Sequence, residues 1–189
     1  MPLTVFTIGH STHSGEKFIA LLHEQGVTLV ADVRTVPRSR RHPQFSQEAL
    51  SEALAASSIG YVHLRGLGGW RRTRPDSPHV GWQDEGFRGY ADYMETAKFV
   101  EHLEKLMELA GKDRVAVMCA EAVPWRCHRS LLADALTVRG VKVIHLLGPG
   151  RVEAHAVTAW ARVEDTRLLY AAPDTLPFDQ LDARPTAPP

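Results

Sequence analysis

Cysteine is scarce in this chain, as are long apolar runs and any excess of charge of one sign. Two cysteines in 189 residues are too few for a disulfide framework, which indicates a reduced, cytoplasmic setting. No apolar run approaches the ~18 residues of a membrane span, and residues 1–10 lack the basic leader of a signal peptide. The 22 basic and 22 acidic side chains balance, so net charge favours neither nucleic acid nor an anionic membrane. We therefore expect a cytoplasmic protein without a membrane partner.

Charge is nonetheless uneven along the chain. Residues 34–74 hold eight arginines and two acidic residues, and the balance reverses over residues 75–105. One interpretation is an ordinary solvated surface, and the other is a surface that binds nucleic acid.

Apolar runs alternate with helical spacing, which predicts an α/β fold. The runs that predict strands lie at residues 3–8, 27–33, 61–64, 115–118 and 141–147. Helices are predicted to begin at Ser14 and Ser46, to cover residues 90–110, and to run from Pro124 to Gly140. This alternation favours a single-domain three-layer sandwich, in which helices cover both faces of a mainly parallel sheet of about five strands.

The remaining segments are a long loop and the C-terminal part. Residues 66–86 are rich in Gly, Pro and Arg and predict a loop, in which Trp70 and Trp82 argue against plain disorder. We expect a last helix over residues 151–163 and a short edge strand over residues 168–170. One domain, residues 1–170, is then followed by a proline-rich tail, residues 171–189, which is loose or laid over the surface.

Polar residues follow each of the five predicted strands. In such folds ligands bind outside the carboxyl ends of the strands. The residues expected at that edge are, in chain order, His10, Asp32, Arg34, Arg65, Cys119, Glu121 and His145. Each alone is typical of a cap, a turn residue or a structural ion pair, but their shared edge predicts a binding site.

Cys119 is the candidate nucleophile. It ends a buried strand and faces the next predicted helix, whose free N–H groups, with Arg126 and His128, would lower its pKa. Rhodaneses and cysteine phosphatases use such a unit, but the spacing from Cys119 to Arg126 is one residue longer than the phosphatase C-x5-R. The alternative is that Cys119 is a small buried hydrophobic residue.

Cys127, predicted in the first turn of the same helix, could face Cys119 as a redox or metal pair. Zinc needs three or four ligands, and C-x7-C is not a usual spacing, so His10 or His128 would have to complete the set. The zinc deaminase signature H-x-E…P-C-x-x-C also fails, because no cysteine follows Pro124 directly. We expect no metal and no cofactor.

Several of these motifs occur together in a familiar order. They are Thr7–Ser11 (TIGHS), Asp32-Val33-Arg34, Leu64–Gly69 (LRGLGG), Cys119-Ala120-Glu121, Cys127-His128-Arg129, and His145 with His155. In this combination the chain resembles the family known as domain of unknown function 488, over about residues 3–155. The resemblance implies a small cytoplasmic α/β protein without an agreed reaction. It also implies one shared pattern of nine residues: His10, Asp32, Arg34, Arg65, Cys119, Glu121, Cys127, His128 and Arg129. The Val123-Pro124-Trp125 insert and the proline-rich tail are unusual here.

The main hypothesis is an enzyme that acts on a small anionic or nucleotide-like ligand at this edge. Arg34, Arg65 and Arg129 would bind the anion, near Asp32 and Cys127, and Cys119 would be the nucleophile or redox thiol. Glu121, His128 and His10 would transfer protons, although a local salt bridge explains Glu121 equally well. The alternatives are a non-catalytic nucleic-acid-binding module, which would use the arginines of residues 34–74 with Trp70 and Trp82, and a partner-interaction protein that uses residues 66–86. The sequence does not give the oligomeric state.

Overall fold

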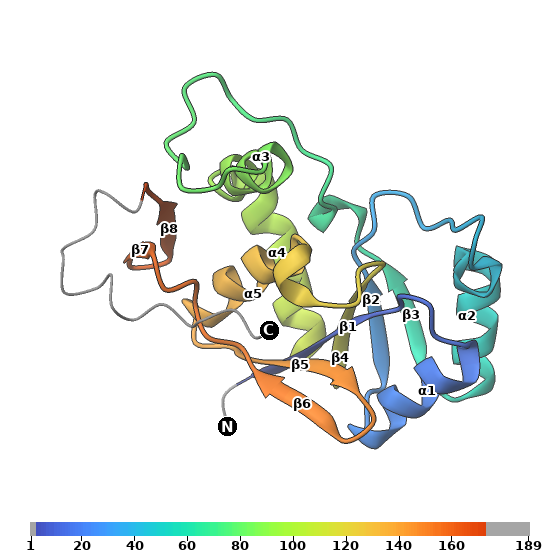
Figure 1. The fold of residues 1–189 in the computed structure, drawn as a ribbon. Coiled ribbons are helices and arrows are strands. Elements are labelled where there is room, and N and C mark those ends of the chain that lie inside the picture. Colours follow the sequence, from blue (N-terminus) through green and yellow to red (C-terminus); the bar gives the residue numbers. More distant parts are fainter. Residues whose placement is uncertain (1–2, 173–189) are drawn as a thin grey trace.

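The computed structural model describes residues 3–172, and a six-stranded sheet lies at its centre (Figure 1). The strands are β1 (Thr4–Gly9), β2 (Leu29–Asp32), β3 (Gly60–His63), β4 (Val115–Cys119), β5 (Lys142–Gly148) and β6 (Arg151–Ala154). Their order is β3-β2-β4-β1-β5-β6; the first five are parallel, and β6 pairs antiparallel with β5. The predicted α/β sandwich with a mainly parallel sheet is confirmed, with one more strand than expected.

Within residues 3–172, four of the five α-helices cover the two faces of this sheet, and the third along the chain packs against the two that follow it (Figure 1). The helices are α1 (Gly15–Glu24), α2 (Gln47–Ala56), α3 (Glu85–Met94), α4 (Ala97–Ala110) and α5 (Arg129–Thr137). Alternate strand residues point to opposite faces. Phe6 and Ile8 therefore pack in the core under α1 and α2, whereas Val5 packs in the core under α4 and α5.

The helix starts predicted from Ser14 and Ser46 are confirmed. The Ser14 hydroxyl accepts a hydrogen bond from the Lys17 N–H at the start of α1. Gly26 follows α1 with φ +62°, a backbone conformation that a side chain would disfavour. Ser46 precedes α2, although its side chain makes no capping bond there.

The single helix predicted over residues 90–110 is in fact two helices. α3 ends at Met94 and α4 begins at Ala97, because Thr96 takes an extended conformation. The Thr96 hydroxyl accepts the Phe99 N–H and so caps α4. Apolar residues of both helices pack in the same core, so their spacing continues across the break.

The predicted start of the helix before Gly140 is also wrong. Pro124 opens a short 3₁₀ turn, Pro124–Arg126, and α5 begins only at Arg129. Cys127 lies between the two in an extended conformation, with φ −139°, and not in the first helical turn.

The helix predicted over residues 151–163 is absent, and two strands take its place. β6 turns back onto β5 through Gly150, whose φ of +64° suits glycine. β7 (Ala161–Glu164) then pairs with β8 (Arg167–Tyr170) in a separate two-stranded sheet, so the predicted strand at 168–170 is present. Asp134 of α5 anchors this region, because its carboxylate accepts hydrogen bonds from His155, Thr158 and Tyr170.

Residues 68–84 form the main part of the expected long loop, between a 3₁₀ turn at Arg65–Leu67 and the start of α3 at Glu85. The Tyr93 hydroxyl and the Arg71 guanidinium both donate to the Gly66 carbonyl, so the start of the loop is fixed. None of the helices within residues 3–172 has the length and apolar character to cross a membrane. The predicted tail lies outside the described residues, apart from its first two positions.

Candidate functional site

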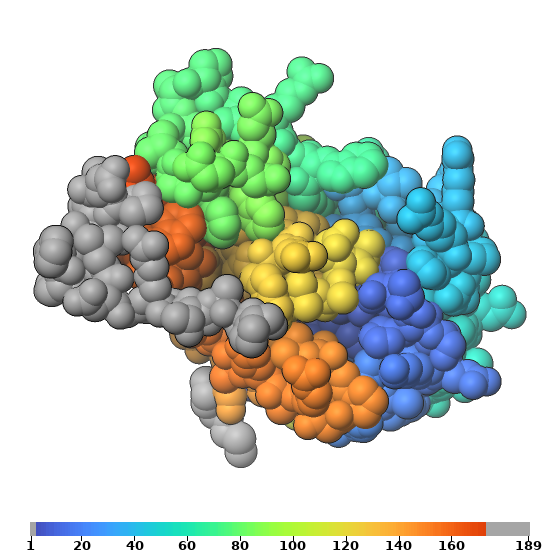
Figure 2. Space-filling view, viewed as in Figure 1, coloured from blue at the N-terminus to red at the C-terminus, as the bar shows by residue number. Residues whose placement is uncertain are grey.

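A cavity of about 440 Å³ opens where β1, β2 and β4 end. Six of the nine predicted site residues line it: His10, Arg34, Cys119, Glu121, Cys127 and His128. The space-filling view shows the loop after β4 (yellow) at the surface, between the segment that follows β1 (blue) and the region of α3 (green) (Figure 2). The edge of the sheet predicted to hold a site therefore holds a cavity.

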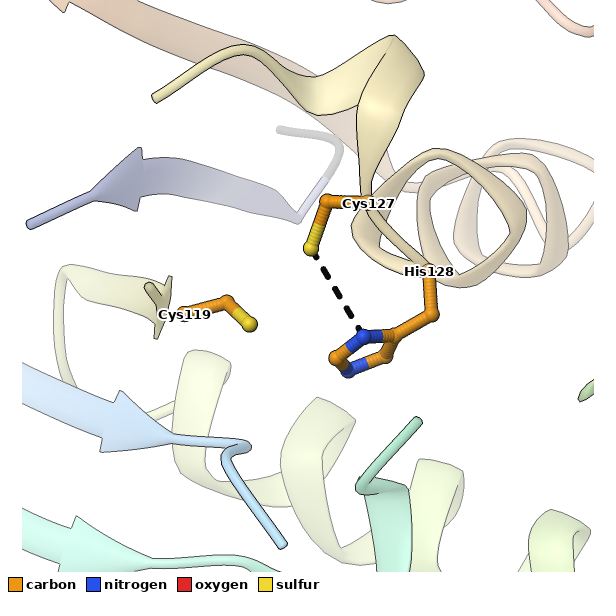
Figure 3. A group of neighbouring side chains, drawn as sticks. All are labelled: Cys119, Cys127 and His128. Carbon is orange, nitrogen blue, oxygen red and sulfur yellow. Dashed lines mark hydrogen bonds between the residues drawn. The ribbon is translucent and has the colours of Figure 1, made fainter. Parts of the chain in front are cut away.

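Cys119, Cys127 and His128 gather in one group beside this cavity, and we call them the thiol–imidazole cluster (Figure 3). Cys119 comes from the end of β4, and the other two come from the junction before α5. The sulfur atoms and one imidazole nitrogen lie within 4.8 Å of one another. The Cys127 sulfur lies 3.6 Å from His128 Nδ1. Both cysteines are free and almost fully buried.

The two thiols of the cluster differ in acidity. The pKa of Cys119 is raised well above its ordinary value, because its thiol interacts with the Cys127 sulfur and is buried. The pKa of Cys127 is lowered well below its ordinary value by the Cys119 thiol, with further contributions from His128 and Arg129. The expectation that Cys119 carries the lowered pKa is therefore not met. The physical reasons are the interaction of the Cys119 thiol with the Cys127 sulfur and the burial of that thiol.

Packing holds the His128 ring in place. A Cβ at Gly69 would lie 2.4 Å from His128 Nδ1, so only glycine allows the 66–86 loop to approach the ring this closely. The Tyr90 ring lies against it at 5.0 Å between centroids. His128 Nε2 is buried and has no hydrogen-bond partner within residues 3–172. The polar contact of this imidazole is thus the one through Nδ1 toward Cys127.

His10 reaches the cavity as predicted and is neutral at physiological pH. Its ring stacks on Phe45 at 4.4 Å between centroids. Burial lowers the pKa of His10 to about 4. Nδ1 donates to the Ser11 carbonyl at 3.0 Å, which leaves Nε2 as the nitrogen able to accept a proton or a hydrogen bond.

Asp32 and Arg34 form a buried ion pair. The Arg34 guanidinium donates to the Asp32 carboxylate at 2.6–3.1 Å through Nε and NH2, and to the Phe45 carbonyl through NH1. The Tyr61 hydroxyl donates to Asp32 as well. Arg34 lines the cavity, but these contacts engage all three nitrogens of its guanidinium, and Asp32 does not line the cavity.

Arg129 and Arg65 lie elsewhere. Arg129 is buried at the start of α5 and donates to the Glu121 carbonyl, so it fixes the loop behind the cavity wall. The Glu121 side chain is exposed in the cavity. The 3₁₀ turn after β3 carries Arg65 to a different hollow, which it shares with His63.

Several cavity residues were not assigned to the site from the sequence, among them Arg38, Arg126, Trp70 and Phe87. Arg126 had been considered for its effect on the Cys119 pKa and for its spacing from Cys119, and Trp70 as part of the long loop and of a nucleic-acid surface. The signal for Trp70 was its place between Gly69 and two arginines in the long loop. Phe87 lies in the first turn of α3, where its backbone N–H donates to the carboxylate of the capping residue Asp84. No feature of the sequence indicated that Phe87 would line the cavity.

Sulfur and imidazole ligands at this separation suit a soft metal ion as well as thiol chemistry. The cluster is the one group of three or more potential metal ligands found within residues 3–172. It combines two thiols with an imidazole and opens onto a cavity that also holds a carboxylate and free guanidinium groups.

Comparisons with known proteins give a family and nothing finer. Neither the curated proteins nor the solved structures contain a match to this chain. One family model, described as domain of unknown function DUF488, matches residues 14–136. That span includes β2, β3 and β4, the thiol–imidazole cluster and most of the cavity wall. The chain therefore belongs to the DUF488 family.

Proposed function

We propose that the protein is an enzyme that binds a small anionic, nucleotide-like ligand in the cavity and transforms it at the thiol–imidazole cluster. The observation that carries this proposal is the position of the cluster, with two buried thiols and an imidazole beside the cavity at the carboxyl edge of a parallel sheet. Binding sites of doubly wound folds lie at this edge. His128 Nε2 is buried without a hydrogen-bond partner within residues 3–172, and such a polar atom is costly to retain for stability alone.

Two arginines give the cavity its preference for an anion. Arg38 and Arg126 line it, are exposed, and have no side-chain partner among residues 3–172. Guanidinium groups bind carboxylate and phosphate oxygens with paired hydrogen bonds. Glu121 and Asp84 also line the cavity, so its charge is mixed and suits a ligand with both an anionic and a polar neutral part.

An aromatic wall adds a preference for a ring. Trp70, which is 78% exposed, and Phe87 both line the cavity. Exposed tryptophan beside free arginine is a common platform for stacking a nucleobase. A phosphate held by Arg126 brings the ligand next to the cluster, because Arg126 directly precedes Cys127 in the chain.

Calorimetric titration of the reduced protein with AMP, adenosine and inorganic phosphate tests the binding part. We expect AMP to bind more tightly than either fragment. Arg126→Gln should weaken AMP binding by about 10-fold or more, because a charge-assisted hydrogen bond contributes about 1.5–3 kcal/mol. Arg151→Gln, a matched change on exposed β6 away from the cavity, should leave binding unchanged. Absence of binding by all three probes would remove the anionic-ligand proposal.

The catalytic part is tested separately, by following AMP, CMP, GMP and UMP with phosphorus NMR during incubation with the protein. We expect one of them to be converted. Cys127→Ser should abolish the conversion but retain binding, since the hydroxyl is close in size but is not a comparable nucleophile or metal ligand. Equal conversion by the wild type and the serine variant would contradict a role for the thiol.

A second candidate function, binding of single-stranded nucleic acid, is favoured by one observation. Trp70 and Trp125 are 78% and 55% exposed, and each is next to an arginine in sequence. Anisotropy of a labelled oligothymidylate tests it. We expect affinity to fall steeply with salt, as it does when phosphates release counterions, and to fall in a Trp70→Ala/Trp125→Ala variant. Binding that does not depend on salt, or no binding at all, would reject the nucleic-acid function and would leave the small-ligand function as the remaining proposal.

A further inference from the structure

The thiol–imidazole cluster has the composition of a zinc site that lacks one ligand, and its sulfur–nitrogen separation matches such a site. In tetrahedral zinc sites the Zn–S distance is about 2.3 Å and the Zn–N distance about 2.0–2.1 Å. These lengths place a sulfur and a nitrogen ligand about 3.5 Å apart, and two sulfurs about 3.8 Å apart. The distance between Cys127 Sγ and His128 Nδ1 is 3.6 Å, and all three ligand atoms lie within 4.8 Å of one another.

The three ligand atoms point toward a common point from two rigid elements (Figure 3). Cys119 is the last residue of β4, which is hydrogen-bonded on both sides, to β1 and to β2. Cys127 and His128 directly precede α5, where Arg129 holds the intervening loop through the Glu121 carbonyl. Gly69 and Tyr90 fix the imidazole by packing, with Nδ1 toward the sulfur. The ligands are therefore positioned before any ion arrives, which favours binding.

The donor set also selects the kind of ion. Thiolate and imidazole ligands suit zinc and similar soft ions, whereas magnesium and calcium prefer oxygen. The cluster offers two sulfurs and one nitrogen, and the two carboxylates of the cavity, Glu121 and Asp84, belong to exposed residues.

We propose that Cys119, Cys127 and His128 bind one zinc ion, with the fourth coordination position open to the cavity. Structural zinc sites close with four protein ligands, whereas catalytic sites have three and leave one position for water or substrate. All three ligands line the cavity in which Arg38 and Arg126 lie, so a ligand held there could occupy the open position. The inference rests on the proposed function for the role of the ion, but not for its binding.

Cobalt and zinc titration of the metal-free, fully reduced protein tests the site. We expect one equivalent of Co²⁺ to produce thiolate-to-cobalt charge-transfer bands and the intense visible bands of a tetrahedral ion, which one equivalent of Zn²⁺ then removes. Mg²⁺ should have no effect. Cys119→Ser, Cys127→Ser and His128→Gln should each weaken zinc binding by more than the 10–100-fold that loss of a second-shell group typically costs. His13→Gln, outside the cavity, is the matched control.

The spectra do not depend on turnover, so the two proposals can fail separately. If the reduced wild type, with both thiols titratable, gives no thiolate-to-cobalt bands, the zinc site is overturned, while AMP binding by the same sample still supports the proposed function. If zinc binds and none of the anionic probes does, the site stands and the proposed function falls. If both Cys119→Ser and Cys127→Ser still bind one equivalent of zinc, the proposed site is also overturned. Circular dichroism of each metal-free variant shows whether a loss reflects unfolding.

Discussion

At the scale of single residues, burial decides which charges a ligand can use. Asp32 and Arg34 stood two positions apart on an extended strand end, where side chains leave on the same side, and either an ion pair or an anion site was expected. The pair formed, and Asp32 is fully buried while Arg34 is 6% exposed. Their charges neutralise each other and stabilise the start of the loop after β2. Free cavity cations come instead from Arg38 and Arg126.

The Asp32–Arg34 pair makes the first prediction. Asp32→Asn leaves the buried guanidinium without its counter-charge, so the free energy of unfolding should fall by about 3–5 kcal/mol. Urea denaturation measures it. Arg167→Gln is the control, because it breaks an exposed pair with Glu95, in which the arginine side chain is 61% exposed, and should cost less than about 1 kcal/mol. Equal losses in the two variants would show that the buried pair contributes no more than a surface one.

At the scale of elements, the break between α3 and α4 depends on one capping residue. Thr96→Ala removes the acceptor of the Phe99 N–H and should lower the free energy of unfolding by about 1 kcal/mol. Thr96→Ser keeps the acceptor and should lose much less. Ser46→Ala is a matched test at a helix start whose hydroxyl makes no capping bond, so it should cost little. A cost at Ser46 as large as that at Thr96 would mean that these values do not report capping.

The sequence predicted the elements whose apolar pattern is local and missed those that depend on distant contacts. The five parallel strands and the caps of α1 follow from runs and spacings within a few residues. β6 has four exposed residues and no strand pattern, and it forms because Gly150 turns it onto β5. The segment that follows is held by Asp134, which lies far away in sequence. Neither the return of β6 nor this anchor is visible in a window of residues 151–163.

At the scale of the whole molecule, strand ends were predictable but the direction of the loops after them was not. The rule that ligands bind at the carboxyl edge of the sheet correctly predicted six of the nine residues, which line the cavity. Arg65 does not line the cavity, because β3 is an edge strand and the turn that follows it carries Arg65 to another hollow. Arg129 does not line the cavity either, because α5 begins at that residue and its side chain is buried there. The C-x7-C spacing argued against a metal site. In the fold, however, an imidazole nitrogen of His128 lies within 4.8 Å of the sulfur atoms of Cys119 and Cys127.

The last prediction concerns the pH dependence of overall stability. His145 is buried between β1 and β6; its Nδ1 lies 2.7 Å from the Thr7 hydroxyl and its Nε2 lies 2.9 Å from His155 Nδ1. Burial, then the nearby His155 and Arg129, lower the pKa of His145 to about 4. The unfolded chain, with a histidine pKa of about 6.5, therefore binds the proton first as the pH falls.

Stability should accordingly be unaffected by His145 above pH 6.5 and should decline between about pH 6.5 and pH 4, by at most about 3 kcal/mol from this residue. Urea denaturation at a series of pH values measures the slope. His145→Gln cannot titrate, so its curve should be flatter than that of the wild type in this window, even though its stability at pH 7 is lower. His23→Gln, on the exposed side of α1, is the matched control for the loss of one histidine. Parallel curves for the wild type and His145→Gln would show that His145 keeps an ordinary pKa in the folded protein.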